Sequence, residues 1–363
     1  MRFAFDENQE LIRRSIDDLT TQFATAADCR SFADSNEPYS ARLWAALAEA
    51  GFIGVRVPER NGGAELGLLE AGSVLEALGR SLASVPYLST SVLAAEIIKD
   101  LGSDPQRDEW LPAIAEGGLT ACVLGVTGAA ASISETGGID GRWAPVVGAA
   151  GASLTLVRIS DSEGEGFVAV TNTSPHLVVE PLSTMDATRR TAAIQMVGLP
   201  ISAASRLPKR LSGDFLARLE AIAAAGAAAE MLGVATRVRD MALAYAKERQ
   251  QFGQPIGAFQ AIKHMIADQQ LLLEGLRSAV WAALWTLDNR PTEGIVLAAI
   301  AKSIADEAVV RLAAENIQIH GGMGFTAEVD AHLYLKRAQL DRILWSPEDH
   351  CNSILSDRLE ELV

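Results

Sequence analysis

Hydrophobic residues recur every three or four positions over long stretches of the second half of the chain. Between residues 215 and 247 this pattern is rich in alanine and free of proline, as in a long buried helix. Pro255 and Gly257 then break the pattern, and Phe259 restarts it. Four helices joined by short corners favour a four-helix bundle over residues 206–363. The predicted helices span 214–249, 259–288, 293–319 and a shorter segment from Ala331 onward.

Shorter helical patterns fill the first part of the chain. Asp6 can cap a helix in which Leu11, Ile16 and Phe23 lie on one face. Further helices are predicted around 44–51, from about 66, over 92–101 and over 110–115. We therefore expect an all-α N-terminal domain over residues 1–118.

Residues 119–205 have a different pattern, in which short runs of β-forming residues alternate with Gly, Ser, Asp and Asn. The candidate strands are 121–126, 154–157, 166–170, 177–179 and 193–197. Strands that follow one another without helices favour a small antiparallel barrel or sandwich and argue against a βαβ dinucleotide-binding sheet. The predicted fold class is thus α+β and mainly α, with a β domain between two helical domains.

Composition and charge narrow the function classes. The chain has 363 residues, of which 49% are apolar, so it is globular. A net charge of -15 disfavours a nucleic-acid partner. Cys29, Cys122 and Cys351 lack the spacing of a metal site or disulfide framework, which suits a reducing cytoplasm. The acidic N-terminus does not look like a signal peptide, and no apolar run reaches the ~18 residues of a membrane span.

The corner after the first long helix places three recognition groups close together in sequence. Arg249 ends the helix, Phe252 follows, and Gln260 opens the next helix. A guanidinium can bind a pyrophosphate through two hydrogen bonds, and an aromatic ring can stack on a base. A plain helical hairpin is the alternative. In that case Arg249 would interact with the helix dipole and Phe252 would be a core residue.

The corner resembles a motif of the acyl-CoA dehydrogenases, flavoproteins that desaturate acyl-CoA thioesters at the α and β carbons. The resemblance rests on Arg249-Gln-Gln-Phe252-Gly followed by Phe259-Gln260. A second family motif, Gln318-Ile-His-Gly-Gly, occurs downstream, and Leu75-Glu-Ala-Leu-Gly resembles the end of an N-terminal helix of the family. The order helix, β, helix is also that of the family.

The resemblance implies a set of FAD contacts that is shared between two subunits. Arg249 and Phe252 match positions at the pyrophosphate and adenine side of an FAD that belongs to a neighbouring subunit, and two adjoining positions complete that contact. Gln318 and the Gly321-Gly322 turn match the segment that approaches the adenosine half of FAD. Glycine has no side chain, so the backbone can approach the ligand closely there. The implied contacts in the bundle are Arg249, Phe252, Phe259, Gln260, Gln318, Gly321 and Gly322.

The flavin ring itself is expected at the β domain, where the match is weaker. Thr127 matches a threonine that faces the isoalloxazine ring and can hydrogen-bond to it. The family sequence Glu-Pro-Gly-Ala-Gly-Ser is replaced after it by Gly128-Ala-Ala-Ala-Ser132. Trp143 is the nearest candidate for the family's Trp-x-Thr contact, although its surroundings differ. Thr127 as an ordinary strand residue is the alternative.

Both positions that hold the catalytic glutamate in the family have other residues here. Desaturation needs a carboxylate that removes the α-proton. One branch of the family places it at the position of Trp345, and another places it at the position of Ala223. Glu230, in an apolar sequence, is the best remaining candidate, unless it pairs with an arginine such as Arg237. Glu220, Glu348 and Asp349 are the other candidate acids.

The resemblance therefore implies an FAD-dependent acyl-CoA dehydrogenase that acts on an acyl-CoA and passes electrons to an electron-transfer flavoprotein or similar acceptor. We expect a homotetramer, or a heterotetramer with a related subunit. Because it lacks the glutamate, the chain resembles the short subunits of heteromeric actinobacterial acyl-CoA dehydrogenases that act on steroid side-chain thioesters. In those enzymes the resemblance implies that the partner subunit supplies the base. A non-catalytic FAD-binding or scaffold subunit and a flavin monooxygenase are the competing hypotheses.

Overall fold

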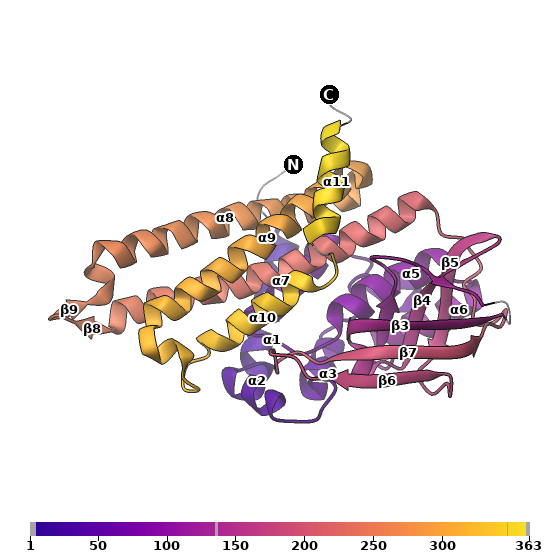
Figure 1. The fold of residues 1–363 in the computed structure, drawn as a ribbon, viewed down its shortest axis with the longest axis horizontal. Coiled ribbons are helices and arrows are strands. Elements are labelled where there is room, and N and C mark those ends of the chain that lie inside the picture. The colour runs from indigo at the N-terminus through magenta and orange to yellow at the C-terminus, as the bar shows by residue number, and fades with distance from the viewer. Residues whose placement is uncertain (1–4, 135–136, 347, 361–363) are drawn as a thin grey trace.

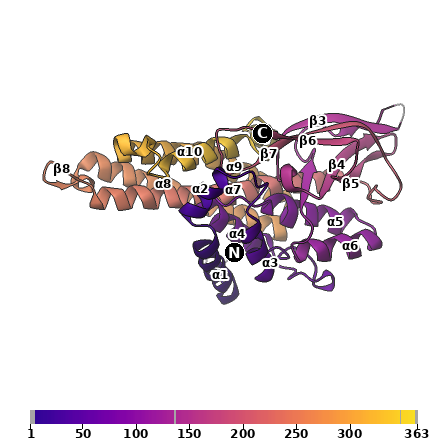
Figure 2. The same cartoon turned by 90° about the horizontal axis from the view of Figure 1, so that it is seen from below.

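The computed structural model describes residues 5–134, 137–346 and 348–360. A bundle of long helices runs along one side of the molecule, and the strands lie beyond one end of it (Figure 1). The N-terminal helices pack beneath the bundle, as the view turned by 90° shows (Figure 2). Mainly helical structure with one β region is the fold class that the sequence predicts.

The N-terminal helices are capped where the sequence predicts a start. The Asp6 side chain accepts a hydrogen bond from the backbone of Gln9, whose side chain bonds back to Asp6, and this box fixes the first turn of α1. The predicted helix over 92–101 instead begins as a π-helix over Leu88–Ala94 and continues as α5. The helices are α1 (Glu7–Phe23), α2 (Ala26–Ala33), α3 (Ala41–Glu49), α4 (Leu68–Arg80), α5 (Ala95–Leu101) and α6 (Asp104–Ala115).

The β region consists of two sheets around a shared apolar core. One sheet has the order β1-β4-β2, with β5 paired to β4, and the other has the order β3-β7-β6. The strands are β1 (Ala121–Leu124), β2 (Ala131–Ser132), β3 (Gly138–Val147), β4 (Leu154–Asp161), β5 (Gly164–Thr171), β6 (Leu177–Leu182) and β7 (Thr191–Pro200). The prediction of a purely antiparallel arrangement is wrong, because β1 and β2 pair in parallel with β4. The chain leaves the first sheet after β2, passes through β3, and returns in the original direction.

The C-terminal half contains the four predicted helices and a fifth that the sequence analysis did not separate. They are α7 (Gly213–Glu248), α8 (Gln260–Asn289), α9 (Pro291–His320), α10 (Ala331–Ile343) and α11 (Glu348–Glu360). Helix α7 is long and apolar enough to cross a membrane, but 94% of its apolar window is buried inside the protein. It is therefore the central core helix of the bundle.

Helices α4 and α7 touch backbone to backbone because glycine lies at their crossing. A Cβ atom added at Gly79 would lie 1.9 Å from the carbonyl oxygen of Glu230, and one added at Gly233 would lie 1.9 Å from that of Glu76. No side chain fits at either position. This contact joins the N-terminal helices to the bundle.

Candidate functional site

The predicted corner is a tight hairpin at the tip of the bundle. After α7, the short strands β8 (Gln250–Gln251) and β9 (Gln254–Pro255) pair around a turn at Phe252 and Gly253, both with positive φ. The Phe252 side chain is 90% exposed, and its ring lies edge-on to that of Phe259 at 6.1 Å between ring centroids. Arg249 is also exposed. The alternative in which Phe252 is a core residue is therefore wrong.

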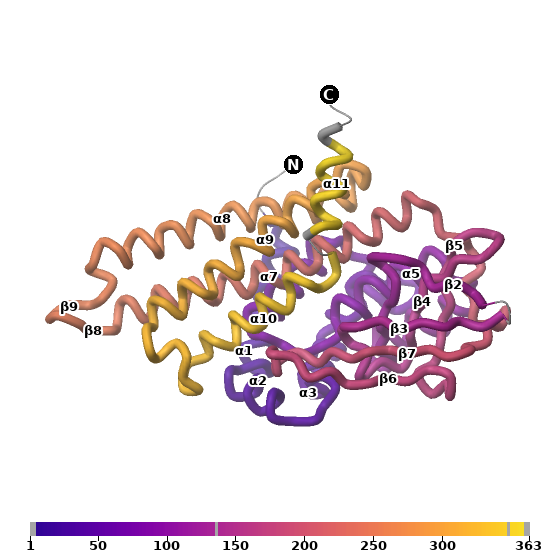
Figure 3. Tube along the Cα trace, viewed as in Figure 1, coloured from indigo at the N-terminus to yellow at the C-terminus, as the bar shows by residue number. Residues whose placement is uncertain are grey.

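The second motif lies at the same end of the bundle. Figure 3 shows the turn between α7 and α8 and the turn between α9 and α10 at one tip. Tyr245 of α7 stacks on His320 of α9 at 4.2 Å, and Ile319 shares an apolar cluster with Ala246 and Ile256. Both motifs thus form one surface, which we call the bundle tip; it contains Arg249, Phe252, Phe259, Gln260, Gln318, Gly321 and Gly322.

The bundle tip suits a ligand that carries phosphate groups. Helix α8 starts after Phe259 without a hydrogen bond from a capping side chain, so its first N–H groups and the positive end of its dipole are open to an anion. Arg249 adds a guanidinium within the same corner. Gly321 has a φ of +60°, and no atom lies within 4 Å of a Cβ added at Gly321 or Gly322. The backbone there is accessible to a flat ligand, and the residues fit the phosphate and adenosine portions of FAD.

A second candidate region is a cavity of about 350 Å³ between the β region and the end of α10. We call it the outer cavity; it is lined by residues 123–127, 142–147 and 343–345. Thr127 and Trp143 both line it, so the structure brings together the two residues that the sequence placed at the flavin ring. Pro145 stands at the third position of the Trp-x-Thr pattern and follows a cis peptide bond.

The bundle tip and the outer cavity lie far apart in one protomer. Trp345 lines the outer cavity and also an inner cavity that Glu230 of α7 lines. From Glu230 to Arg249 the helix runs for 19 residues, or about 28 Å at the usual rise per residue. The two sets of predicted contacts therefore lie in two separate regions of one chain.

The inner cavity is nearly filled. It has room for about one water, about 10 Å³. Its walls come from α4, the segment before and within the π-helix, the end of β3, α7 and Trp345. The lining residues are Leu75, Leu78, Ala83, Val85, Pro86, Tyr87, Leu88, Ser89, Val147, Arg189, Glu230 and Trp345.

Glu230 is held by two buried arginines. Its Oε1 atom accepts hydrogen bonds from Arg189 and, at 3.4 Å, from Arg337. The alternative in which Glu230 pairs with an arginine is confirmed, but the partner is not Arg237, which is exposed and lies beside Tyr334 in a different groove. The Oε1 atom of Glu230 is thus already engaged in ion pairs with two guanidiniums. No local sequence pattern indicates these partners, which lie 41 and 107 residues away along the chain.

The same arginines bind two more buried carboxylates. Arg189 donates to Asp341 at 2.6 Å, and Arg337 donates to Asp186 at 2.6 Å. With Glu230, three carboxylates thus share two guanidiniums. Burial raises the pKa of Asp341 to about 7, and the charge of Glu230 adds to the effect while Arg189 opposes it. Sequence analysis did not single out Asp341, although this acid lies only four residues before Trp345.

Neither Glu220 nor Asp349 lines the outer cavity. Glu220 pairs with His350 at 3.5 Å, and burial raises its pKa while His350 lowers it. Asp349 is exposed on α11, and the Glu348 side chain lies outside the described residues. Ala223 is fully buried. Among the described residues that line the outer cavity, none is an acid.

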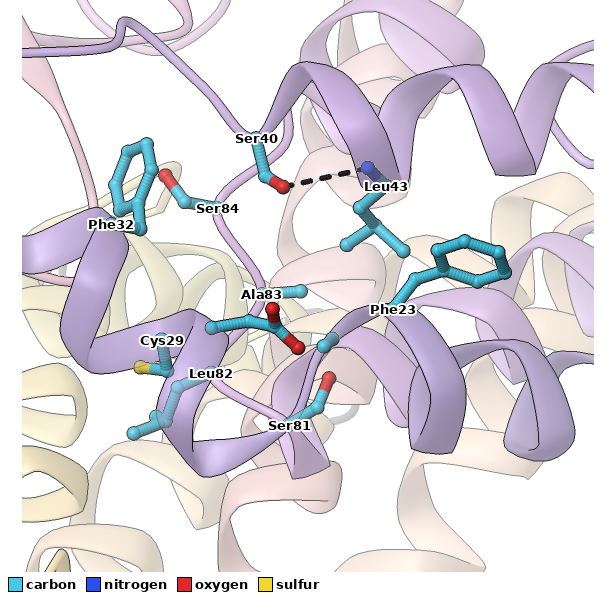
Figure 4. A pocket seen from close by; sticks show the side chains of 11 residues that line it. Phe23, Cys29, Phe32, Ser40, Leu43, Ser81, Leu82, Ala83 and Ser84 are labelled. Atoms are coloured by element: carbon cyan, nitrogen blue, oxygen red, sulfur yellow. Dashed lines mark hydrogen bonds between the residues drawn. The ribbon is translucent and has the colours of Figure 1, made fainter. Parts of the chain in front are cut away.

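Two other hollows lack the predicted site residues. A small apolar cavity between the N-terminal helices contains Cys29 (Figure 4), and burial raises the pKa of that thiol to about 11. It is therefore not a nucleophile at neutral pH. A polar groove of about 560 Å³ lies over α1, α4 and α10; its Arg80 already pairs with Asp240.

Comparisons with known proteins agree with this geometry. The family descriptions "Acyl-CoA dehydrogenase, N-terminal domain" and "Acyl-CoA dehydrogenase, C-terminal domain" match residues 6–118 and 221–351. The acyl-CoA dehydrogenase IpdE2 of Mycolicibacterium smegmatis is 34% identical over 343 residues, which are 94% of this chain and 95% of the relative. FadE27 of Mycobacterium tuberculosis is 29% identical over 93% of each chain.

Solved structures resemble the whole chain. A chain of the ChsE4-ChsE5 complex from Mycobacterium tuberculosis superposes with a TM-score of 0.91 and 27% identity over 99% of both chains. A variant of the Tcur3481-Tcur3483 steroid ACAD gives a TM-score of 0.87 and 29% identity over 98% of both. The chain therefore belongs to the acyl-CoA dehydrogenases, the family of FAD-containing oxidoreductases that act on CH–CH groups.

Proposed function

We propose that the chain is the half-site subunit of a heteromeric acyl-CoA dehydrogenase that introduces an α,β double bond into an acyl-CoA. Its bundle tip grips the phosphate and adenosine portions of an FAD whose ring lies against a related partner subunit. The partner supplies the carboxylate that removes the α-proton. When bound, FAD would supply the hydride acceptor for the β carbon, and an electron-transfer flavoprotein or similar acceptor in the cytoplasm would receive the electrons.

The state of Glu230 carries this proposal. The two positions where relatives place the base are Trp345 and Ala223, and neither side chain can accept a proton. Glu230, which lines the inner cavity together with Trp345, is bound by Arg189 and Arg337. A subunit with such a pocket needs a base from elsewhere if it is to take part in proton abstraction.

The exposed bundle tip supports the other half of the proposal. In the assembly, Arg249 would hold the pyrophosphate together with the open N-terminus of α8. Phe252 and Phe259 would cover the adenine, while Gln318 and the Gly321-Gly322 backbone would approach the adenosine. Phe252 is 90% exposed in the single chain, and such a large exposed aromatic ring is typical of a surface that a ligand or partner covers.

The relatives favour a bulky substrate. Two of the similar structures, the ChsE4-ChsE5 complex and the Tcur3481-Tcur3483 steroid ACAD, are each named for two components. Thr127 and Trp143 keep a polar and an aromatic group in the outer cavity of this chain. We therefore infer an acyl-CoA with a steroid or similarly bulky acyl group as the substrate of the assembly, with a heterotetramer as its form.

The absorption spectrum and native mass of the freshly purified protein test the proposal. We expect the chain to be colourless and inactive when expressed alone, and yellow and active when co-expressed with a base-containing relative. A yellow protein that reduces a dye with acyl-CoA in the absence of any partner would overturn the half-site proposal. It would favour a self-sufficient dehydrogenase.

The contribution of the bundle tip is tested by Arg249→Ala. This variant should lose FAD from the co-expressed assembly, because the pyrophosphate loses its guanidinium. Arg249→Lys keeps the charge but not the two parallel hydrogen bonds, so it should retain an intermediate amount. Equal flavin content in all three proteins would contradict the assignment of Arg249.

A further inference from the structure

Trp345 separates the two cavities of this chain. Its indole lines the outer cavity together with Thr127 and Trp143, and it also lines the inner cavity together with Glu230. Val147 is the other residue that borders both cavities. Trp345 and Val147 therefore lie between the outer cavity and the inner cavity beside α7.

The backbone holds this indole in place by an unusual turn. Trp345 has a φ of +66°, a conformation that is costly for a bulky side chain and persists only where the surroundings enforce it. The N–H of Ser346 donates to the carbonyl oxygen of Leu344 at 2.8 Å, which closes a three-residue turn. Ser346 is buried, and Cys351 of α11 lies 3.6 Å from its hydroxyl. The turn is thus held by its own backbone hydrogen bond and by the contact of Ser346 with α11.

The space behind the indole is closed by apolar side chains. Leu88 packs so closely on α7 that its Cδ1 atom would lie 2.6 Å from a Cβ added at Gly226. Ala223, one turn earlier, is completely buried. What remains open is about 10 Å³ beside Arg189 and Glu230, which admits one water and no acyl chain.

We propose that Trp345 is a plug that closes the acyl pocket of this subunit, so that the thioester binds only in the partner's pocket. The inference rests on the proposed half-site function. It adds that this subunit lacks room for the acyl chain as well as a catalytic base. A fully buried aromatic side chain covers about 150–250 Å², and Trp345 is partly buried against the core. Its removal would join the two cavities into a channel whose inner walls are Leu75, Leu78, Leu88 and Val147, which is a lining suited to an alkyl chain.

The test counts ligand molecules per copy of this chain. The probe is S-dodecyl-CoA, a thioether that lacks the carbonyl needed for α-proton removal, titrated by calorimetry into the protein in the assembly in which it purifies. Wild type and the control Trp345→Phe should bind no ligand at this subunit. Trp345→Ala should bind one additional equivalent per copy. Trp345→Gly should do the same, and it also relieves the positive φ, so it provides a second opened variant if the alanine variant does not fold.

Two results would overturn the plug. One is a wild-type protein that binds more ligand than one equivalent per partner subunit, which means any ligand at all if the chain purifies without a partner. The other is a folded Trp345→Ala or Trp345→Gly variant with the wild-type count. Failure of the half-site proposal has a different readout, namely bound flavin and turnover in the chain purified without a partner. The number of ligands bound does not depend on turnover, so the two proposals can fail independently.

Discussion

The balance of charge around Glu230 decides what this carboxylate can do. Three buried carboxylates, Asp186, Glu230 and Asp341, face two buried guanidiniums, Arg189 and Arg337. The cluster therefore has one negative charge in excess when every group is ionised. Removal of a carboxylate relieves the excess, whereas removal of a guanidinium increases it.

Glu230→Gln should leave turnover of the assembled enzyme unchanged, because the side chain serves structure and not proton abstraction. It should lower the free energy of unfolding by only about 1–2 kcal/mol through weakened hydrogen bonds. Arg189→Ala should lower the free energy of unfolding by about 3–5 kcal/mol, because it leaves buried carboxylates without a compensating positive charge. Denaturant unfolding and steady-state kinetics check both variants. A folded Glu230→Gln enzyme whose kcat falls by orders of magnitude would instead identify Glu230 as the base.

The raised pKa of Asp341 predicts a dependence of stability on pH. The folded protein holds this proton up to a pKa of about 7, against an ordinary value of 3.8. Between these values the folded state binds more protons than the unfolded state, so stability should fall as pH rises from about 4 to about 7. Asp341→Asn mimics the protonated form and should flatten this part of the profile. Parallel slopes of wild type and variant in denaturant titrations across this range would contradict the assignment.

Sequence analysis identified individual residues well where a local motif exists and poorly where contacts are long-range. The capping Asp6 and the exposed cluster from Arg249 to Gln260 follow from neighbours within a few positions. The partners of Glu230 could not be found in this way. Arg189 reaches it from the segment before β7, and Arg337 reaches it from α10. Only the fold brings these residues together.

At the scale of elements, the α4–α7 crossing depends on glycine. Gly79→Ala places a methyl group 1.9 Å from the Glu230 carbonyl, so the helices must separate, and we expect a loss of about 1–3 kcal/mol or more. Gly275 on α8 is the matched control, because it is exposed and no atom lies within 4 Å of an added Cβ. Gly275→Ala should stabilise the protein by about 0.5–1 kcal/mol. Equal melting temperatures of the two variants would contradict the close packing of the crossing.

The long helices were predicted to within a few residues, because their apolar period continues to the Pro and Gly residues that end them. Strand β3 was missed, since its sequence Gly-Ile-Asp-Gly-Arg-Trp-Ala-Pro-Val-Val contains two glycines and a proline, which signal turns locally. Its ladder with β7 has irregular register where these residues occur. Pairing with a neighbour therefore overrides the local preference.

At the scale of the whole molecule, the exposed tip predicts an assembly. Phe252→Ala should leave the chain folded by circular dichroism, because the Phe252 side chain is 90% exposed and contributes little to the core. The same variant should lower the flavin content and shift the native mass towards smaller species. Leu11→Ala, at a side chain that is 63% exposed on the distant helix α1, is the control and should change neither. Unaltered mass and flavin for Phe252→Ala would exclude the tip from the contact between subunits.

The length of α7 has a consequence for how relatives of this chain can diverge. The helix carries the tip at its end and the Glu230 cluster 19 residues earlier, and each residue advances the axis by about 1.5 Å and turns it by about 100°. One inserted residue would rotate Arg249 away from its ligand and also shift it along the axis. The number of residues between Glu230 and Arg249 must therefore stay constant among relatives that keep both sites. We expect tolerated insertions in the loops of the β region.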